Sequence, residues 1–434
     1  MYRNILEQLK QWKEKTNRKP LVLSGARQVG KTYILQKFGA AYFSNVAYIN
    51  CDDNELAKGL FVKDYDMQRI ILAIGAITGQ RIEAGKTLII LDEIQEAPRG
   101  LSVLKYFCEH APQYHVAVAG SLLGITMHRG ESFPVGKVDV LSIYPMTFDE
   151  FLLAKGKEQM VKLLHSKDWD TIRLIRGELI KALREYYFVG GMPEVVAAFI
   201  ATNDALIVRE IQQSILFTYQ KDISKHVPVS ESNRIQMVWH SMPSQLVKEN
   251  KKFIYGVAKP GGRAKDFEVA IQWLMDAGLV YKAERIQQPK MPLKFYVDIS
   301  SFKLFVLDCG LLGAMSETPP ELLLVADNGM EESKGAFTEN YLMSQLVATT
   351  GSSVFYYSND AKLEIDFVIQ QGREIVPIEA KAEENLRSKS LATFVAAHPG
   401  MHGLRFSMSD YREQDWMTNV PLYAASTYFG TASI

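Results

Sequence analysis

A short stretch near the N-terminus has the residue types and the spacing of a phosphate-binding loop. Residues 25–32 are Gly25-Ala26-Arg27-Gln28-Val29-Gly30-Lys31-Thr32, which fits the pattern G-x-x-x-x-G-K-T, and an apolar run precedes them. The glycines let backbone N–H groups point at phosphate oxygens, and a helix N-terminus follows the loop. Lys31 is expected to reach the β- and γ-phosphates, and the Thr32 hydroxyl to bind Mg²⁺. The stretch therefore predicts a site for ATP with Mg²⁺.

Two acidic residues supply the second part of such a site. Asp92 and Glu93 follow the apolar run 88–91, so they lie at the C-terminal end of a predicted buried strand, where open α/β sheets bind ligands. We expect Asp92 to hold Mg²⁺ and Glu93 to polarise the attacking water. Ser121 ends the next predicted strand and is expected between the phosphates and the acids. The alternatives are a chance Gly-Lys-Thr in a loop and a site that binds ATP without hydrolysing it.

A second group of charged residues lies in the C-terminal third of the chain. Glu339 is on a predicted helix, and Asp366 and the pair Glu379-x-Lys381 are on two predicted strands joined by a turn near Gly372. A period of two places Glu379 and Lys381 on one sheet face, and we expect Asp366 on the same face. Asp366 and Glu379 are candidate ligands for Mg²⁺ or Mn²⁺; with Glu339 and Lys381 they would orient a water toward a phosphodiester. The pattern resembles the PD-(D/E)xK nuclease superfamily, and the alternative is a set of solvated charges on a half-exposed sheet.

The elements that position these residues change in character along the chain. The first third alternates apolar runs with helical segments, which predicts an α/β fold with a parallel P-loop NTPase sheet covered on both faces. A mostly helical part follows, and then three short helices and a strand pair in the order of a winged helix. In the last part we expect helices around 301–312 and 335–349 and strands at 353–357, 364–369 and 374–381. The predicted domains are a P-loop ATPase core (1–150), a helical lid (151–225), a winged-helix-like domain (226–295) and a nuclease-like α/β domain (296–434).

Composition limits the classes of partner. The 434 residues include 49 Lys and Arg and 49 Asp and Glu, so the net charge is zero and any DNA-binding surface must be local. The candidate surface lies between Lys248 and Lys265, where basic residues alternate with Phe253 and Tyr255. The three cysteines have no zinc-type spacing and predict no disulfide framework. With no signal sequence and no apolar stretch of about 18 residues, the expectation is a cytoplasmic protein without membrane contact.

Segments from one end of the chain to the other together resemble one family. They are residues 24–32, 91–95, 119–121, 190–195, 219–225, 302–304, 308–312 and 364–368. The chain is similar to bacterial and archaeal AAA+-type ATPases that carry a C-terminal domain of unknown function. The resemblance implies an ATPase domain, a winged-helix-like middle and a nuclease-like C-terminal fold, without a known biological role.

The chain departs from this family at one position. Lys137 follows Gly136 where the family pattern has an arginine, and lysine lacks the planar guanidinium that would act on a neighbouring subunit's nucleotide. Arg99, Arg129 and Arg184 are the remaining candidates for a trans-acting arginine, and the alternative for each is a solvated surface charge.

Two functions follow from the sequence. In the first, an ATP-dependent enzyme acts on DNA, and its C-terminal site cuts nucleic acid. In the second, an ATP-switched regulatory or assembly protein binds a protein partner or itself, and its nuclease-like domain is an inactive binding module. The complete carboxylate and lysine set favours the first function. The neutral net charge and two acids on the predicted recognition helix, Asp266 and Glu268, favour the second.

Overall fold

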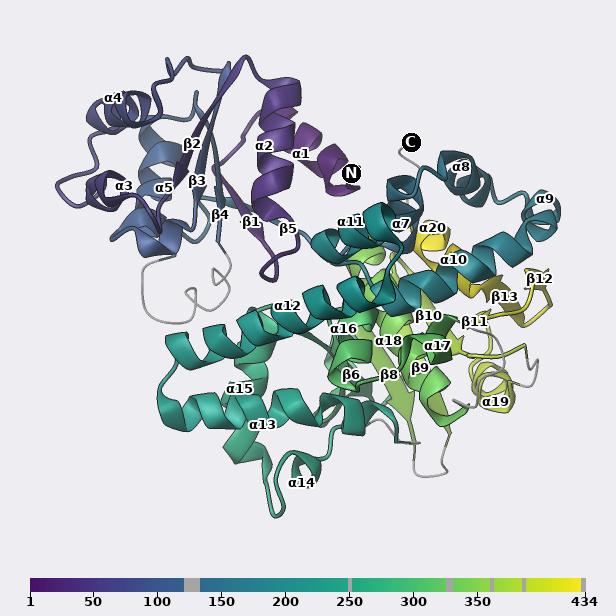
Figure 1. The fold of residues 1–434 in the computed structure, drawn as a ribbon. Coiled ribbons are helices and arrows are strands. Elements are labelled where there is room, and N and C mark those ends of the chain that lie inside the picture. The colour runs from purple at the N-terminus through teal and green to yellow at the C-terminus, as the bar shows by residue number, and fades with distance from the viewer. Residues whose placement is uncertain (121–132, 249–251, 325–330, 360–362, 385–387, 431–434) are drawn as a thin grey trace. The chain divides into compact units, whose positions relative to one another are not determined.

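The structure, a computed structural model, describes residues 1–120, 133–248, 252–324, 331–359, 363–384 and 388–430. The chain divides into two compact units (Figure 1). The first unit consists of residues 3–144 with the short segment 276–278, and the second contains residues 1–2, 145–275 and 279–434. The predicted boundary near residue 150 therefore lies close to an observed boundary, whereas those at 225/226 and 295/296 fall inside the second unit.

The first unit is a five-stranded sheet in which every neighbouring pair of strands is parallel. The strand order is β2-β3-β4-β1-β5. The strands are β1 (Leu21–Ser24), β2 (Asn45–Asn50), β3 (Thr87–Asp92), β4 (His115–Ala119) and β5 (Asp139–Ser142). The helices are α1 (Ile5–Glu14), α2 (Lys31–Tyr42), α3 (Glu55–Gly59), α4 (Met67–Thr78), η1 (Ile94–Glu96) and α5 (Gly100–His110).

This sheet forms the core of the first unit because apolar side chains cover both of its faces. Every residue of β3 and β4 is buried, as expected for strands covered on two sides. Figure 1 shows α1 and α2 on one face of the sheet and α3, α4 and α5 on the other. Because β4 lies between β1 and β3, the phosphate loop after β1 and the acids at the end of β3 belong to the same edge of the sheet. The predicted parallel α/β architecture is confirmed here.

Helices make up the first part of the second unit. They are α7 (Phe148–Ala154), α8 (Glu158–Ser166), α9 (Trp169–Leu174), α10 (Arg176–Val189), α11 (Pro193–Thr202), α12 (Ala205–His226), α13 (Val229–Leu246), α14 (Tyr255–Ala258) and α15 (Ala264–Asp276). A tight loop joins α10 to α11 at Gly190 and Gly191. A Cβ on Gly190 would lie 2.1 Å from Asp308 Oδ1, and one on Gly191 would lie 2.1 Å from the Met146 carbonyl oxygen. These glycines therefore allow a close backbone approach within the second unit.

A mixed eight-stranded sheet forms the rest of the second unit. Its order is β12-β13-β11-β10-β9-β8-β6-β7. The strands are β6 (Val280–Ile286), β7 (Val297–Val306), β8 (Val354–Ser358), β9 (Glu364–Gln371), β10 (Glu374–Ala380), β11 (Gly403–Ser407), β12 (Arg412–Glu413) and β13 (Met417–Pro421). The accompanying helices are η2 (Leu293–Tyr296), α16 (Cys309–Met315), α17 (Pro320–Leu324), α18 (Glu331–Thr350), α19 (Lys389–Ala397), η3 (Leu422–Ala424) and α20 (Ala425–Phe429).

Two predictions concern the segments that lead into this sheet. The helix expected around 301–312 is wrong in its first half, because residues up to Val306 form β7 and a helix begins only at Cys309. A short apolar run such as 302–306 fits either element by its periodicity, and pairing with β6 decides it. The helices α13–α15 and the β6–β7 hairpin follow in the order of a winged helix. The hairpin is also the edge of the eight-stranded sheet, since β6 pairs with β8.

Candidate functional site

The phosphate loop connects β1 to α2 in the first unit. Gly30 is the N-cap of α2 and has a φ of 93°, a left-handed conformation that glycine adopts at little cost. A Cβ on Gly25 would lie 2.3 Å from the carbonyl oxygen of Ile143, so the loop passes close to the backbone after β5. Both glycines of the motif are therefore required by geometry. The first N–H groups of α2, which have no partner within the helix, lie at the end of this loop.

Lys31 is buried at the start of α2. Its Nζ donates hydrogen bonds to the carbonyl oxygens of Gly25 and Ala26, at 2.9 Å and 2.7 Å. Burial lowers the pKa of Lys31 to about 8, although the nearby carboxylates of Asp92 and Glu93 favour its charged form. A desolvated ammonium with only carbonyl partners gains much from phosphate oxygens, because hydrogen bonds between charged groups are the stronger ones.

Asp92 lies at the end of β3 and joins the acidic strand to the phosphate loop. Its Oδ2 accepts hydrogen bonds from Thr32 Oγ1 at 2.6 Å and from the Tyr48 hydroxyl at 3.1 Å. Its Oδ1 accepts one from the backbone N–H of Glu93. Burial raises the pKa of Asp92, and the neighbouring Glu93 carboxylate adds to this rise, while the hydrogen bonds from Thr32 and Tyr48 oppose it. The oxygens of Thr32 and Asp92 form a hard-ligand pair that fits Mg²⁺.

Glu93 occupies an uncommon backbone conformation beside Asp92. Its φ of 47° lies in the left-handed region, which non-glycine residues seldom adopt. Gln95 donates a hydrogen bond from Nε2 to Glu93 Oε2, and this contact restrains the carboxylate. Ser121, the expected polar residue at the end of β4, lies outside the described residues.

Two further residues support this site, and neither was among the residues predicted from the sequence. Arg3 is buried and donates hydrogen bonds to the carbonyl oxygen of Val29 at 2.8 Å and to that of Tyr144 at 2.5 Å. These two hydrogen bonds connect the phosphate loop to the backbone that follows β5. Tyr48 is the other, and its only signal in the sequence is a polar tip within an apolar strand. Arg27 and Gln28 complete the loop, and Gln28 Oε1 is buried without a hydrogen-bond partner among the described residues.

The arginine candidates for a trans-acting cation, and the lysine at the family's arginine position, have the following contacts in the structure. Arg99 donates hydrogen bonds to the Tyr65 hydroxyl and to the Val62 carbonyl oxygen, so it braces a loop of its own unit. Lys137 pairs with Glu109 at 2.9 Å. Arg184 belongs to the second unit, where it lines a cavity of about 320 Å³. Arg129 lies outside the described residues.

The charged residues of the C-terminal third come together in the second unit. Glu339 is on α18, Asp366 on β9 and Glu379 on β10, and Lys381 follows β10. Lys381 Nζ lies 2.9 Å from Glu379 Oε1, and Asp366 Oδ2 accepts a hydrogen bond from the Ala380 N–H at 2.9 Å. Burial lowers the pKa of Lys381, but Glu379, Asp366 and Glu339 outweigh it and raise the pKa. The four residues therefore share one electrostatic environment.

Two further charged residues complete this cluster. Lys303 on β7 is fully buried, and its Nζ lies 2.5 Å from Glu364 Oε1 and 4.0 Å from Glu339 Oε2. Lys303 belongs to a segment that resembles the family, but the sequence assigned it no partner. Among the residues that the structure describes, no group of three or more His, Cys, Asp or Glu residues is placed to hold a metal ion.

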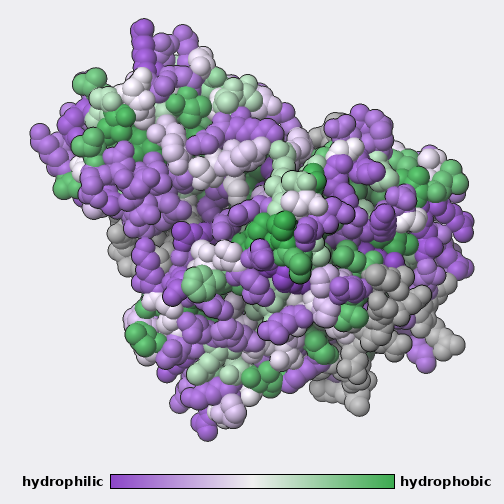
Figure 2. All heavy atoms as spheres, viewed as in Figure 1, coloured by the Kyte–Doolittle hydropathy of each residue, from purple (hydrophilic) through white to green (hydrophobic). Residues whose placement is uncertain are grey.

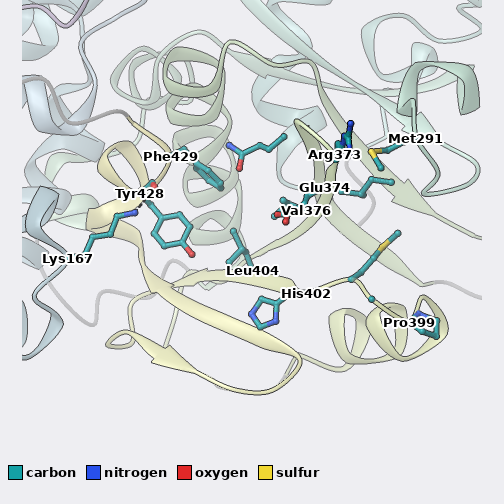
Figure 3. Close-up of a pocket in the computed structure, with 14 residues that line it drawn as sticks. Lys167, Met291, Arg373, Glu374, Val376, Pro399, His402, Leu404, Tyr428 and Phe429 are labelled. Carbon is teal, nitrogen blue, oxygen red and sulfur yellow. Dashed lines mark hydrogen bonds between the residues drawn. The ribbon is translucent and has the colours of Figure 1, made fainter.

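A separate cavity of about 650 Å³ in the second unit is drawn in Figure 3. The Lys167 side chain extends toward Tyr428, and its Nζ donates a hydrogen bond to the Tyr428 carbonyl oxygen at 3.3 Å. Arg373, Glu374 and His402 also line this cavity. None of the site residues predicted from the sequence is among its lining residues.

The basic segment of the middle region has fewer exposed aromatic rings than expected. Phe253 is buried, and its ring stacks on that of Phe302 with centroids 5.5 Å apart. Tyr255 packs against Phe253 and Phe267. These rings stabilise the contact of α14 and α15 with β7 and are not positioned as platforms for nucleic-acid bases.

Within the described part of the chain, no helix has both the length and the apolar character needed to span a membrane. The face of the molecule in Figure 2 is mostly hydrophilic, and its apolar residues occur in separate groups.

Three family models match successive parts of the chain. Residues 17–152 match a family described as an AAA domain. Residues 180–322 and 334–424 match two families, each described as a domain of unknown function (DUF8612 and DUF4143). The first match, together with the loop and acid geometry, shows that the first unit contains a P-loop ATPase domain of the AAA type. No curated protein matches the chain in sequence.

The solved structures that match this chain are distant from it. A Walker-type ATPase of Pyrococcus abyssi is 11% identical, over 72% of this chain and 94% of that one, with a TM-score of 0.45. The ORC2 protein of Aeropyrum pernix is 13% identical over 74% and 87%, with a TM-score of 0.33. The RuvB Holliday junction branch migration motor of Thermotoga maritima is 16% identical over 64% and 88%, with a TM-score of 0.30. Likenesses of this size do not indicate a shared activity.

Proposed function

We propose that the first unit, which contains the AAA-type P-loop domain, binds ATP with Mg²⁺ and hydrolyses it. The observation that carries this proposal is the 2.6 Å hydrogen bond from Thr32 Oγ1 to Asp92 Oδ2. This bond joins Thr32, which follows the loop lysine, to Asp92 at the C-terminal end of the buried strand β3. The site therefore places hydrogen-bond donors for phosphate oxygens, oxygen ligands for Mg²⁺ and a second carboxylate at one edge of the sheet.

Each residue of the site has a role that its surroundings support. The loop N–H groups and the N-terminus of α2 bind phosphate, and Lys31 transfers its hydrogen bonds from two loop carbonyl oxygens to the phosphates. Thr32 and Asp92 would hold Mg²⁺, which neutralises phosphate charge when bound. Glu93 orients and polarises the attacking water, and Gln95 restrains the Glu93 carboxylate.

For the second unit we propose a binding module whose partner, a protein or a second copy of this chain, is regulated by the nucleotide state of the first unit. Three features support this form. The net charge is zero, Phe253 of the basic segment is buried with Tyr255 packed against it, and Glu364 and Glu379 of the cluster pair with lysines. The chain would then be an ATP-switched regulatory or assembly protein of the cytoplasm.

Action on DNA with cleavage by the second unit is the other candidate function. One observation favours it. The sequence α18-β8-β9-β10-α19-β11 brings Glu339, Asp366, Glu379 and Lys381 into one cluster, as the resemblance to the PD-(D/E)xK nucleases implies. Mg²⁺ or Mn²⁺ would then be required at Asp366 and Glu379.

ATP turnover tests the first proposal. We expect Lys31→Ala to abolish turnover and Glu93→Gln to bind ATP without hydrolysing it, while Lys37→Ala, on the exposed side of the same helix, keeps full activity. Unchanged turnover in the Lys31→Ala variant would refute the site.

Cleavage of plasmid and single-stranded DNA with Mg²⁺ or Mn²⁺, with and without ATP, compares the two candidate functions. Cleavage by the wild type that is lost in the Asp366→Ala variant would establish a nuclease. Absence of cleavage by both proteins, with ATPase activity intact, would support the binding module.

A further inference from the structure

The strand β10 has an open edge at its beginning. It pairs with β9 from its first residue, whereas its pairing with β11 begins only where Ile378 meets Leu404. In the same register, the segment 400–402 would lie beside residues 374–376 of β10. That segment precedes β11 and is not part of a strand. In the part of the chain that the structure describes, residues 374–376 therefore have no neighbouring strand on the β11 side.

The backbone groups of Ile375 point toward this open edge. In an antiparallel pair, residues whose N–H and C=O groups bond to the neighbouring strand alternate with residues whose groups point away from it. Lys381, an even number of positions after Ile375, donates its N–H to the carbonyl oxygen of Phe406 on β11 at 2.8 Å. Pro377, also an even number of positions away, has no N–H to give to β9. The alternation therefore directs the N–H and C=O of Ile375 away from β9, where an added strand could pair with them.

A cavity of about 650 Å³ lies between the two segments that fail to pair. Residues 374–376 line it from β10, and residues 399–402 line it from the segment before β11. Figure 3 shows Glu374 and Val376 across the cavity from His402. Ligand sites in proteins measure about 300–1,000 Å³ and are largely apolar. The apolar lining residues here include Met291, Ile375, Val376, Met401, Leu404 and Phe429. An extended chain in this cavity would continue β11 beside the beginning of β10.

Two cations line the cavity and form no ion pair within the described residues. Lys167 extends toward Tyr428, and its Nζ donates a hydrogen bond to the Tyr428 carbonyl oxygen at 3.3 Å (Figure 3). Arg373 is exposed in the turn between β9 and β10. Glu374 is the single carboxylate among the lining residues, and His402 is taken as neutral at pH 7. The lining therefore carries one net positive charge, which complements an acidic ligand.

We propose that this cavity binds an extended, acidic peptide segment of a partner protein, which adds a strand beside the beginning of β10. Its backbone pairs with the N–H and C=O of Ile375, and its acidic side chains contact Lys167 and Arg373. Addition of a peptide strand to an open sheet edge takes affinity from backbone hydrogen bonds and specificity from alternate side chains. The inference rests on the binding role proposed for the second unit, and it names the partner of that module.

Fluorescence anisotropy of a labelled synthetic hexapeptide of alternating valine and glutamate, added to the full chain, tests the proposal. We expect Arg373→Glu to weaken binding about tenfold or more, because it inverts a charge of the lining. Arg234→Glu makes the same change at an exposed position of α13 and should leave binding unchanged. The hexapeptide methylated at its backbone nitrogens should not bind, and one with lysine in place of glutamate should bind about tenfold more weakly or worse. No binding of the glutamate peptide, or equal binding after backbone methylation, would overturn the proposal.

A second variant examines the strand edge itself. Ile375→Pro removes the N–H that faces the open edge and takes no donor from the pairing with β9, as Pro377 does in the wild type. We expect this variant to bind the glutamate peptide about tenfold more weakly and to keep its ATP turnover. If it does not fold, Arg373→Glu in the exposed turn decides the test.

The peptide site and the binding module fail separately. If the wild type neither cleaves DNA nor binds the glutamate peptide, the peptide site is refuted and the module stands. DNA cleavage that is lost in Asp366→Ala would refute the module itself.

Discussion

Replacing Lys31 by methionine is expected to stabilise the first unit and to abolish ATP binding. The lysine is 7% exposed, and its pKa is lowered from 10.5 to about 8. The difference of about 2.5 units means that keeping the ammonium charged costs the folded state about 3 kcal/mol at pH 7. Methionine removes that cost but leaves the Gly25 and Ala26 carbonyl oxygens without a donor, at about 1 kcal/mol each. We expect a net gain of about 1 kcal/mol for the variant at pH 7.

The pH dependence of this gain has a definite sign. Between pH 8 and pH 10.5 the folded lysine loses its proton while the unfolded one keeps it, so the unfolded state binds more protons and the stability of the wild type rises with pH. The variant should therefore lose about 1 kcal/mol relative to the wild type between pH 8 and pH 9, since the folded lysine is already half deprotonated at pH 8. Below about pH 7 both states are charged and the difference is constant.

Amide hydrogen exchange in peptides from β1 and β3 measures the effect in the full chain. At pH 7 a gain of this size slows exchange roughly 5-fold, after correction for the intrinsic exchange rate. Lys37→Met, at an exposed position of the same helix, is the control and should change little. A Lys31→Met variant that exchanges as fast as the wild type at pH 7, or a difference that is the same at pH 7 and pH 9, would refute the reasoning.

Three further predictions concern single contacts. Tyr48→Phe removes one donor to Asp92 and should lower kcat/KM for ATP about tenfold and raise the Mg²⁺ requirement; steady-state kinetics at varied Mg²⁺ measure both, and unchanged values would contradict the role of Tyr48. Gly191→Ala places a Cβ 2.1 Å from the Met146 carbonyl oxygen and should destabilise the second unit by at least 1–3 kcal/mol in urea unfolding, whereas Gly177→Ala, where a Cβ meets nothing within 4 Å, should not. Burial raises the pKa of Asp308 to about 6 from 3.8, so the stability of wild type relative to Asp308→Asn should fall as pH rises from about 4 to 6; thermal melts across this range would contradict it by showing no change.

The positions of the phosphate loop and of the acids after β3 in the α/β unit were predictable because their signals are local. A glycine-rich loop after a buried strand and acids at the end of another buried strand specify their own backbone surroundings within a few residues. The parallel sheet then follows from apolar strands that alternate with helices. The supporting contacts of Tyr48 and Arg3 were not predictable, since each depends on how strands and loops far apart in the sequence are brought together.

The β7 segment illustrates the limit of local patterns. Its apolar run fits a helix or a strand by periodicity, and the predicted helix from residue 301 was wrong. Pairing with β6 decided the structure, and that pairing also made the predicted wing part of a larger sheet. The close contacts of the Gly190-Gly191 loop with Asp308 and Met146 likewise join segments that lie far apart in the sequence.

The sequence by itself identified the candidate residues for chemistry, which are the loop from Gly25 to Thr32, the acids after β3, and the carboxylates with Lys381 in the last third. Only the tertiary structure decided what surrounds them. Lys303 lies on a strand distant in sequence from α18 and β9, and the folded sheet places its ammonium among their carboxylates. The partners of a charged side chain depend on which strands pair and which helix covers them, so these contacts arise only on folding.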